Sequence, residues 1–256
     1  MTGSVRLPVV LVLLPPSETK SDGGEGGPLD LADLSMPQLT ETREMLVQAL
    51  VDLAADPEES SRALGLGAKG ADEIERNAKL WVSPTRPALE RYTGVLYDAL
   101  DAAAFTKAQR EKATRRLGVG SALFGAVRAG DPIPAYRLSG GSKLPGLGTL
   151  KSVWRAELTE ALVTEAGGDL VVDLRSGVYQ QLGPVPGAIT ATVLTEQADG
   201  TRKVVSHFNK HHKGLLARAL VLTRADPSDI DSVARVASKA GLRVEVTSPT
   251  ELVVLT

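Results

Sequence analysis

The stretch that decides the fold is VVLVLLPPSETK, residues 9–20. Its six consecutive apolar residues, Val9 to Leu14, predict a central strand buried on both faces, because a half-exposed strand alternates apolar and polar residues. Two prolines end the run. In α/β proteins, ligand-binding groups often follow the carboxyl end of such a strand. The polar residues at that position are Ser17, Glu18, Thr19 and Lys20.

The remaining segments indicate one mixed α/β domain. A clear amphipathic helix over residues 149–168 is followed by a second buried strand over 169–176 and by a hairpin that turns at Asp199-Gly200. Helices and strands mix without a strict βαβ repeat, and no change in composition marks a boundary. We therefore expect a single domain over residues 1–256, with a mixed β-sheet surrounded by helices.

The composition restricts the class of function. Of the 256 residues, 43% are hydrophobic and 23% charged, as in ordinary globular proteins, and the net charge of −2 gives no general attraction to nucleic acid or membranes. Cysteine is absent, which excludes disulfides, thiolate catalysis and thiol-based redox sensing. The apolar run at residues 9–14 is too short for a signal peptide or a membrane span. We expect a cytoplasmic protein without a membrane partner.

The pattern LGLGAKGADEI, residues 64–74, fits the helix-hairpin-helix consensus, glycine-hydrophobic-glycine-xxx-alanine-xx-isoleucine. Its matching residues are Gly65, Leu66, Gly67, Ala71 and Ile74. Such a hairpin, expected at about residues 60–80, exposes backbone N–H groups that bind a nucleic-acid phosphate without reading sequence. Lys69 would add positive charge. The alternative is a glycine-rich turn that binds nothing.

All three histidines fall in SHFNKHHKG, residues 206–214. They are His207, at the end of a strand, and His211 and His212, in the first turn of a helix. Neighbouring helix positions point about 100° apart, and the segment has no carboxylate or cysteine, so we expect no metal site. If Asn209 caps the helix, its first amides and the side chains of Lys210 and Lys213 form an anion site. A solvated basic surface is the alternative.

Ordered motifs across nearly the whole chain resemble the YaaA family, known as peroxide stress proteins. They are PPSETK (15–20), RYTGVLYDAL (91–100), SALFGAVRAGDPIPAYRL (121–138), LVVDLRSGVY (170–179) and VVSHFNKHHKGLLAR (204–218). The resemblance implies a cytoplasmic protein that limits oxidative damage, in some members linked to lower available iron. It also implies an α/β fold with a positively charged cleft and a helix-hairpin-helix-like element that binds DNA. Glu18 departs from the family, which often has lysine there. The resemblance points to Lys210 and Lys213, rather than the imidazoles, as shared chemistry.

Two functions of different class follow, and the favoured one is sequence-independent DNA binding without catalysis. Its phosphate-binding residues would be Gly65, Leu66, Gly67, Lys69, Arg128, Arg137, Lys143, Asn209, Lys210 and Lys213. The alternative is an enzyme or binding protein for a small phosphorylated or carboxylated metabolite. Its cleft would contain Ser17, Glu18, Thr19, Tyr136, Arg137 and Lys210. A third interpretation assigns protection to protein–protein contact. No catalytic motif and no cofactor site is identified.

Overall fold

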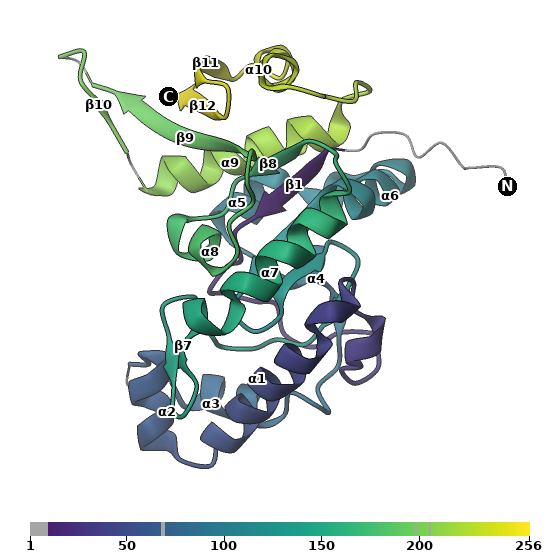
Figure 1. Ribbon diagram of the computed structural model, residues 1–256, viewed down its shortest axis with the longest axis vertical. Helices are drawn as coiled ribbons and strands as arrows, with labels where there is room; N and C mark the ends of the chain where they lie inside the picture. Colours follow the sequence, from purple (N-terminus) through teal and green to yellow (C-terminus); the bar gives the residue numbers. More distant parts are fainter. Residues whose placement is uncertain (1–9, 68–69, 198, 205) are drawn as a thin grey trace, which may run out of the picture.

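The computed structural model describes residues 10–67, 70–197, 199–204 and 206–256 (Figure 1). Its main feature is an eight-stranded mixed sheet in the order β11-β12-β9-β8-β1-β3-β4, with β10 paired to β9. The parallel strands are β1 (Leu11–Leu14), β3 (Leu117–Ser121), β8 (Val171–Asp173), β9 (Ile189–Glu196) and β12 (Glu251–Leu255). The antiparallel strands are β4 (Gly125–Arg128), β10 (Arg202–Lys203) and β11 (Arg243–Ser248). The mixed α/β fold is confirmed.

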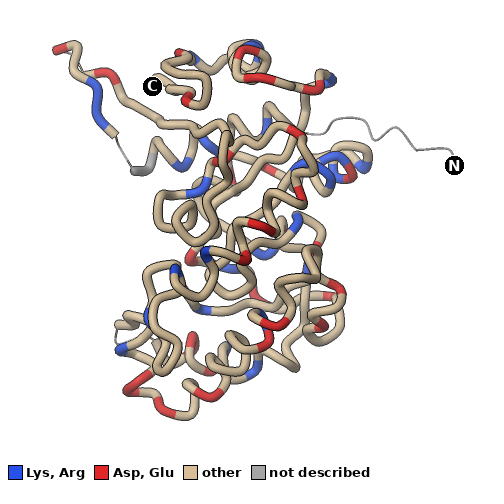
Figure 2. The backbone as a smooth tube through the Cα atoms, viewed as in Figure 1, with Lys and Arg blue, Asp and Glu red and all other residues tan. Residues whose placement is uncertain are grey.

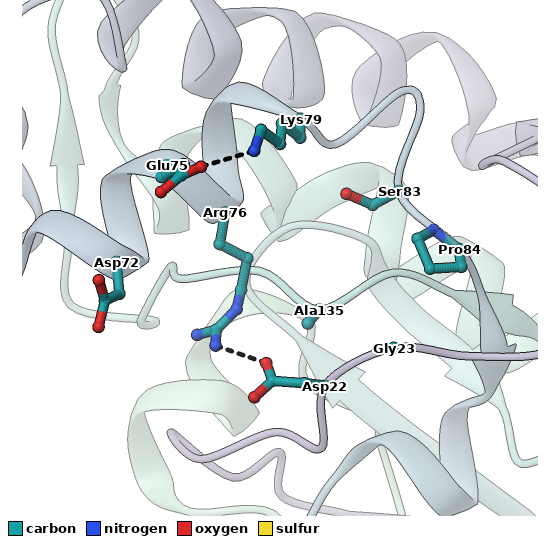
Figure 3. Close-up of a pocket in the computed structure, with 9 residues that line it drawn as sticks. All are labelled: Asp22, Gly23, Asp72, Glu75, Arg76, Lys79, Ser83, Pro84 and Ala135. Atoms are coloured by element: carbon teal, nitrogen blue, oxygen red, sulfur yellow. Dashed lines mark hydrogen bonds and ion pairs between the residues drawn. The ribbon is translucent and has the colours of Figure 1, made fainter.

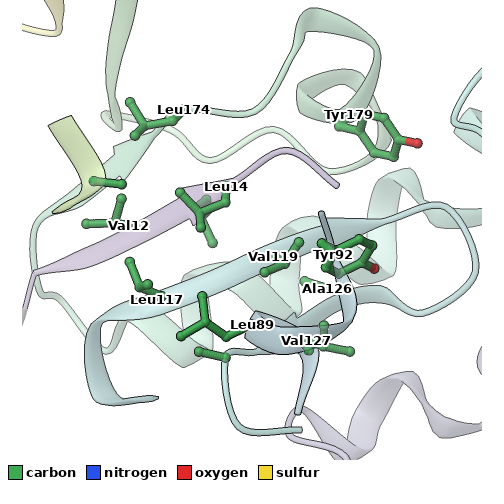
Figure 4. Packing of buried hydrophobic residues seen from close by; sticks show 14 of the residues in the cluster. Val12, Leu14, Leu89, Tyr92, Leu117, Val119, Ala126, Val127, Leu174 and Tyr179 are labelled. Atoms are coloured by element: carbon green, nitrogen blue, oxygen red, sulfur yellow. The ribbon is translucent and has the colours of Figure 1, made fainter. Parts of the chain in front are cut away.

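Strand β1 lies at the centre of this sheet, as its unbroken apolar sequence predicts. All four residues of β1 are buried, and Val12 pairs with Leu117 of β3 on one side and with Val172 of β8 on the other. Figure 4 shows side chains of β1 and β3 in one cluster with Leu174, which directly follows β8. A strand that is buried on both faces needs helices on both sides of the sheet.

Helices supply these two layers. On one side α7 (Leu150–Ala166) packs against α8 (Gly177–Leu182), and α7 stands in the foreground of Figure 1. In the other layer α9 (Ser206–Leu222) packs against α5 (Val95–Leu100) and α6 (Lys107–Arg116) and contacts β1. Helix α10 (Ile230–Lys239) packs on β11 and α9.

A group of helices lies at the end of the molecule opposite β10 to β12 (Figure 1). It contains α1 (Thr40–Leu53), α2 (Pro57–Leu64), α3 (Ala71–Ala78) and the small hairpin of β6 (Lys143–Leu144) and β7 (Gly148–Thr149). Arg43 of α1 is fully buried and donates hydrogen bonds to the carbonyl oxygens of Phe124, at 3.0 Å, and Ala126, at 2.8 Å. These bonds attach the helical group to the turn into β4.

The contact between α5 and α9 depends on a glycine. A Cβ atom added at Gly214 would lie 2.3 Å from the carbonyl oxygen of Leu96 and 2.8 Å from Cβ of Ala99. Carbon atoms do not approach backbone this closely, so any larger residue would separate the two helices. Gly214 therefore sets how closely α9 approaches α5.

We predict that Gly214→Ala lowers the free energy of unfolding by about 1–3 kcal/mol, although alanine alone is favoured over glycine in a helix. Gly177→Ala in α8 is the matched control, because no atom lies within 4 Å of its added Cβ. It should be neutral or slightly stabilising. Urea unfolding followed by circular dichroism measures both, and equal stability of the two variants would contradict the tight contact.

Candidate functional site

A cavity of about 730 Å³ lies at the carboxyl edge of the sheet, beyond β1 and β8. Its walls come from residues 15–19, 93–97, 174–180, 190–192 and from α9. The chain reaches β3 on one side of β1 and returns to β8 on the other side. The loops that leave these neighbouring parallel strands therefore diverge, which opens a crevice at the point where α/β sheets bind ligands.

Helix α9 lines the cavity with Asn209, Lys210 and Lys213. Lys210 is exposed, whereas Lys213 points inward and its Nζ donates a hydrogen bond to the carbonyl oxygen of Leu174 at 3.1 Å. Burial lowers the pKa of Lys213, and the Asp173 carboxylate partly opposes that effect. The expectation that Asn209 caps the helix is wrong, because α9 begins at Ser206 and Asn209 lies within its first turn.

A buried ion pair under the cavity was not predicted from the sequence. Asp173 ends β8, and Arg175 donates from Nε and Nη2 to its two carboxylate oxygens at 2.9 and 2.7 Å. Both residues are buried, with exposed fractions of 3% and 1%. The sequence did contain a signal for this ion pair. Asp173 and Arg175 lie two residues apart at the end of a buried strand, and a buried charge requires a partner of opposite charge.

Lys20 forms a second amine site, next to the loop that lines the cavity. Its Nζ donates a hydrogen bond to the carbonyl oxygen of Ser17 at 3.0 Å and lies 4.2 Å from the ring centre of Tyr136. Burial is the main reason that the pKa of Lys20 falls from 10.5 to about 7. Tyr136 itself is fully buried and shares 2.8 Å hydrogen bonds with the hydroxyls of Tyr92 and Ser121. Tyr136 was predicted in the small-ligand cleft, but it does not line the cavity.

Glu18 and Arg137 connect the cavity wall to the helical group. Arg137 Nη1 lies 2.6 Å from a carboxylate oxygen of Glu18. The backbone of Arg137 is held by Asn77 of α3, whose side chain bonds its carbonyl oxygen at 2.9 Å and its N–H at 2.8 Å. Within the small-ligand set, the structure thus joins Glu18 to Arg137, and it places Ser17, Glu18, Thr19 and Lys210 on the cavity.

The predicted helix-hairpin-helix element consists of α2 and α3 and a turn in which Gly65 has a left-handed backbone, φ 62°. The N–H groups of Gly65 and Leu66 donate to carbonyl oxygens of α2 itself, so these two amides are already satisfied. Gly67 accepts a hydrogen bond from the N–H of Gly70. Lys69 lies outside the described residues.

The charge around α3 is mixed rather than positive. Figure 3 shows the adjoining pocket of about 300 Å³, where Arg76 pairs with Asp22 and Lys79 pairs with Glu75. Arg76 also pairs with Glu73. Figure 2 shows acidic residues interspersed with basic ones in this part of the molecule. These pairings leave little free positive charge to attract a phosphate.

The other residues of the predicted DNA-binding set are separated from one another. Lys143 is exposed on β6 of the helical group. Arg128 pairs with Glu165 at 2.6 Å and stands opposite Gly118, at the amino end of β3. It therefore lies at the sheet edge opposite the cavity. Of that set, the structure brings Asn209, Lys210 and Lys213 to the cavity.

The two described histidine rings bond or stack locally. Nδ1 of His212 lies 3.0 Å from the carbonyl oxygen of Phe208, and the rings of His211 and His212 meet edge-on at 5.3 Å. The side chain of His207 is outside the described residues, and its backbone belongs to α9 instead of ending a strand. Within the described part of the chain, no group of three metal-binding side chains occurs. No described helix has the length and apolar content for crossing a bilayer.

Comparison with known proteins identifies the family. The family model for peroxide stress protein YaaA matches residues 10–246. The chain belongs to the YaaA family. A UPF0246 protein of Corynebacterium efficiens is 52% identical over 242 residues, which cover 93% of this chain and 95% of that protein. A UPF0246 protein of Streptomyces coelicolor is 46% identical, covering 94% of each chain. The resemblance seen in the sequence is confirmed, and YaaA membership supports a role in the peroxide stress response.

Lys20 makes stability depend on pH. The unfolded chain keeps its lysine protonated up to about pH 10.5, whereas the folded protein loses that proton near pH 7. The unfolded state therefore binds more protons between these values, and the free energy of unfolding rises with pH. From pH 7 to pH 9 the lysine should add about 2 kcal/mol.

We predict that Lys20→Met removes this rise, as measured by urea unfolding at several pH values between 6 and 9. Lys239→Met changes an exposed lysine and is the control, which should keep the parent's pH dependence. If the free energy of unfolding changes with pH in the same way for the parent and for Lys20→Met, the lowered pKa of Lys20 is contradicted.

Proposed function

We propose that this YaaA protein serves in the peroxide stress response by binding a small carboxylated or phosphorylated molecule in the cavity beyond β1 and β8. The observation that carries the proposal is the pair of lysines, Lys210 and Lys213, that one face of α9 contributes to this cavity. Two amines in one recess create a local positive charge on a molecule whose net charge is −2.

The size and lining of the cavity favour a metabolite. Its volume of about 730 Å³ is within the range of small-molecule sites, which combine apolar walls with a few placed polar groups. Pro15, Val95 and Leu96 provide apolar surface, while Thr190 and Thr192 of β9 provide hydroxyl groups. A ligand's charged group would lie near α9, and its remainder would contact these walls.

Nucleic-acid binding stays a prediction and is the competing hypothesis. The residues assigned to it lie in three separate places, and α3 carries Asp72 and Glu73 in its first turn. Duplex DNA would instead have to contact exposed cations around Lys210 and Lys143. Such binding depends steeply on salt concentration, because it releases counterions from the DNA. A connection to iron likewise stays a prediction.

We predict that a small anion raises the melting temperature of the protein in proportion to its occupancy. The probes are inorganic phosphate, pyruvate, glyoxylate and ATP, each titrated in a thermal-shift assay. Lys210→Ala and Asn209→Ala should weaken the binding of a positive probe about 10–100-fold, as expected for a lost charge-assisted or polar contact.

Lys239→Ala, an exposed lysine on α10, is the matched control and should bind like the parent. The same proteins are titrated with fluorescent duplex DNA at several salt concentrations. If no anion changes the melting temperature, while DNA binds with a steep salt dependence that requires Lys210, the cavity proposal is wrong and the nucleic-acid hypothesis replaces it.

A further inference from the structure

Two lysines one turn apart on α9 meet the cavity in different surroundings. The side chain of Lys210 is exposed to solvent. Lys213 is turned inward, and its Nζ lies 3.1 Å from the carbonyl oxygen of Leu174 and 3.5 Å from that of Arg175. Both side chains line the same recess. Lys210 is therefore placed to attract an anion electrostatically, whereas Lys213 is placed to act as a nucleophile.

The surroundings of Lys213 make its amine easier to deprotonate than that of an exposed lysine. Among the described residues, no carboxylate forms an ion pair with its Nζ, and the nearby Asp173 has both oxygens engaged by Arg175. Burial lowers the pKa of Lys213. Once deprotonated, the amine can donate its two hydrogens to these two carbonyl oxygens and keeps a lone pair for bond formation. A desolvated lysine beside a second cation is the arrangement that activates an amine as a nucleophile.

We propose that Lys213 is a catalytic nucleophile that condenses with the carbonyl carbon of a small aldehyde or keto acid, whose anionic group is held by Lys210. This inference rests on the proposed function, because it concerns the same cavity. The Nζ lone pair forms a bond to the carbonyl carbon, and the carbonyl π electrons move to oxygen. The nitrogen gives up both of its protons in turn to that oxygen, which leaves as water, and a C=N bond forms. No oxidant, reductant or cofactor enters this balance.

Lys20 is the rival amine, since burial lowers the pKa of this lysine as well. Its surroundings differ, because Lys20 lies over the ring of Tyr136 and does not belong to the cavity lining. Its bonds to the carbonyl oxygens of Ser17 and Glu18 hold the loop that forms the wall. We therefore assign a structural role to Lys20 and the reactive role to Lys213.

The test is reductive trapping of the full chain with glyoxylate and cyanoborohydride near neutral pH, followed by mass spectrometry of the intact protein and of its peptides. We expect one adduct, located on Lys213, that forms at least about 10-fold faster than adducts on exposed lysines such as Lys239. Lys210→Ala should slow trapping of glyoxylate but not of propionaldehyde, which has no anionic group.

Lys213→Arg keeps the positive charge and should abolish the adduct while inorganic phosphate still raises its melting temperature. Unlabelled Lys213 in the parent, despite a phosphate-dependent shift, would overturn the nucleophile and leave the proposed anion site intact. Labelling of Lys20 in place of Lys213, or labelling spread evenly over surface lysines, would also overturn it. Peptide mapping of the parent decides these outcomes even if the arginine variant folds poorly.

Discussion

The burial of β1 between two parallel partners is the constraint on which the rest of the structure depends. Val12 faces Leu117 on one side and Val172 on the other, so the strand has no solvent-facing edge. Its backbone groups are satisfied only inside the sheet, and its apolar side chains require helices on both faces. Because β3 and β8 lie on opposite sides of it, the segments that leave β1 and β8 separate. The cavity is a consequence of this topology.

The close packing of α9 against α5 determines where Lys213 lies in the cavity. Gly214 lets the helix approach the backbone of α5 closely, and Lys213, one residue earlier, reaches the carbonyl oxygen of Leu174. An amine that is buried loses hydration, and this burial lowers the pKa of Lys213. Directly beneath it, the buried pair of Asp173 and Arg175 neutralises a carboxylate that would otherwise keep the amine charged. The pairing of Asp173 with Arg175 therefore bears on the pKa of Lys213.

The walls of the cavity are held from outside by the helical group. Asn77 forms two hydrogen bonds with the backbone of Arg137, and Arg137 forms an ion pair with Glu18 on the loop after β1. The glycine-rich segment that follows the same loop is fixed as well, because the N–H of Gly26 donates to the carbonyl oxygen of Thr85 at 3.0 Å. Side chains whose supports are themselves bonded keep a defined geometry, which favours discrimination among small ligands. The helical group therefore serves the site by holding it in place.

The fold class, the central position of the first strand and the family could all be predicted from the amino-acid sequence. These features are local, because apolar runs, glycine patterns and motif order can be read along the chain. Tertiary structure alone decided which charged residues are free. The sequence contains no information on the distance between Arg128 and Glu165, or between Arg137 and Glu18, yet these ion pairs engage two arginines that were predicted to contact DNA. It likewise placed Asn209 at a helix cap, since the start of α9 at Ser206 has no distinct local signal. Pairing and burial depend on contacts between distant segments, and those contacts exist only after the chain has folded.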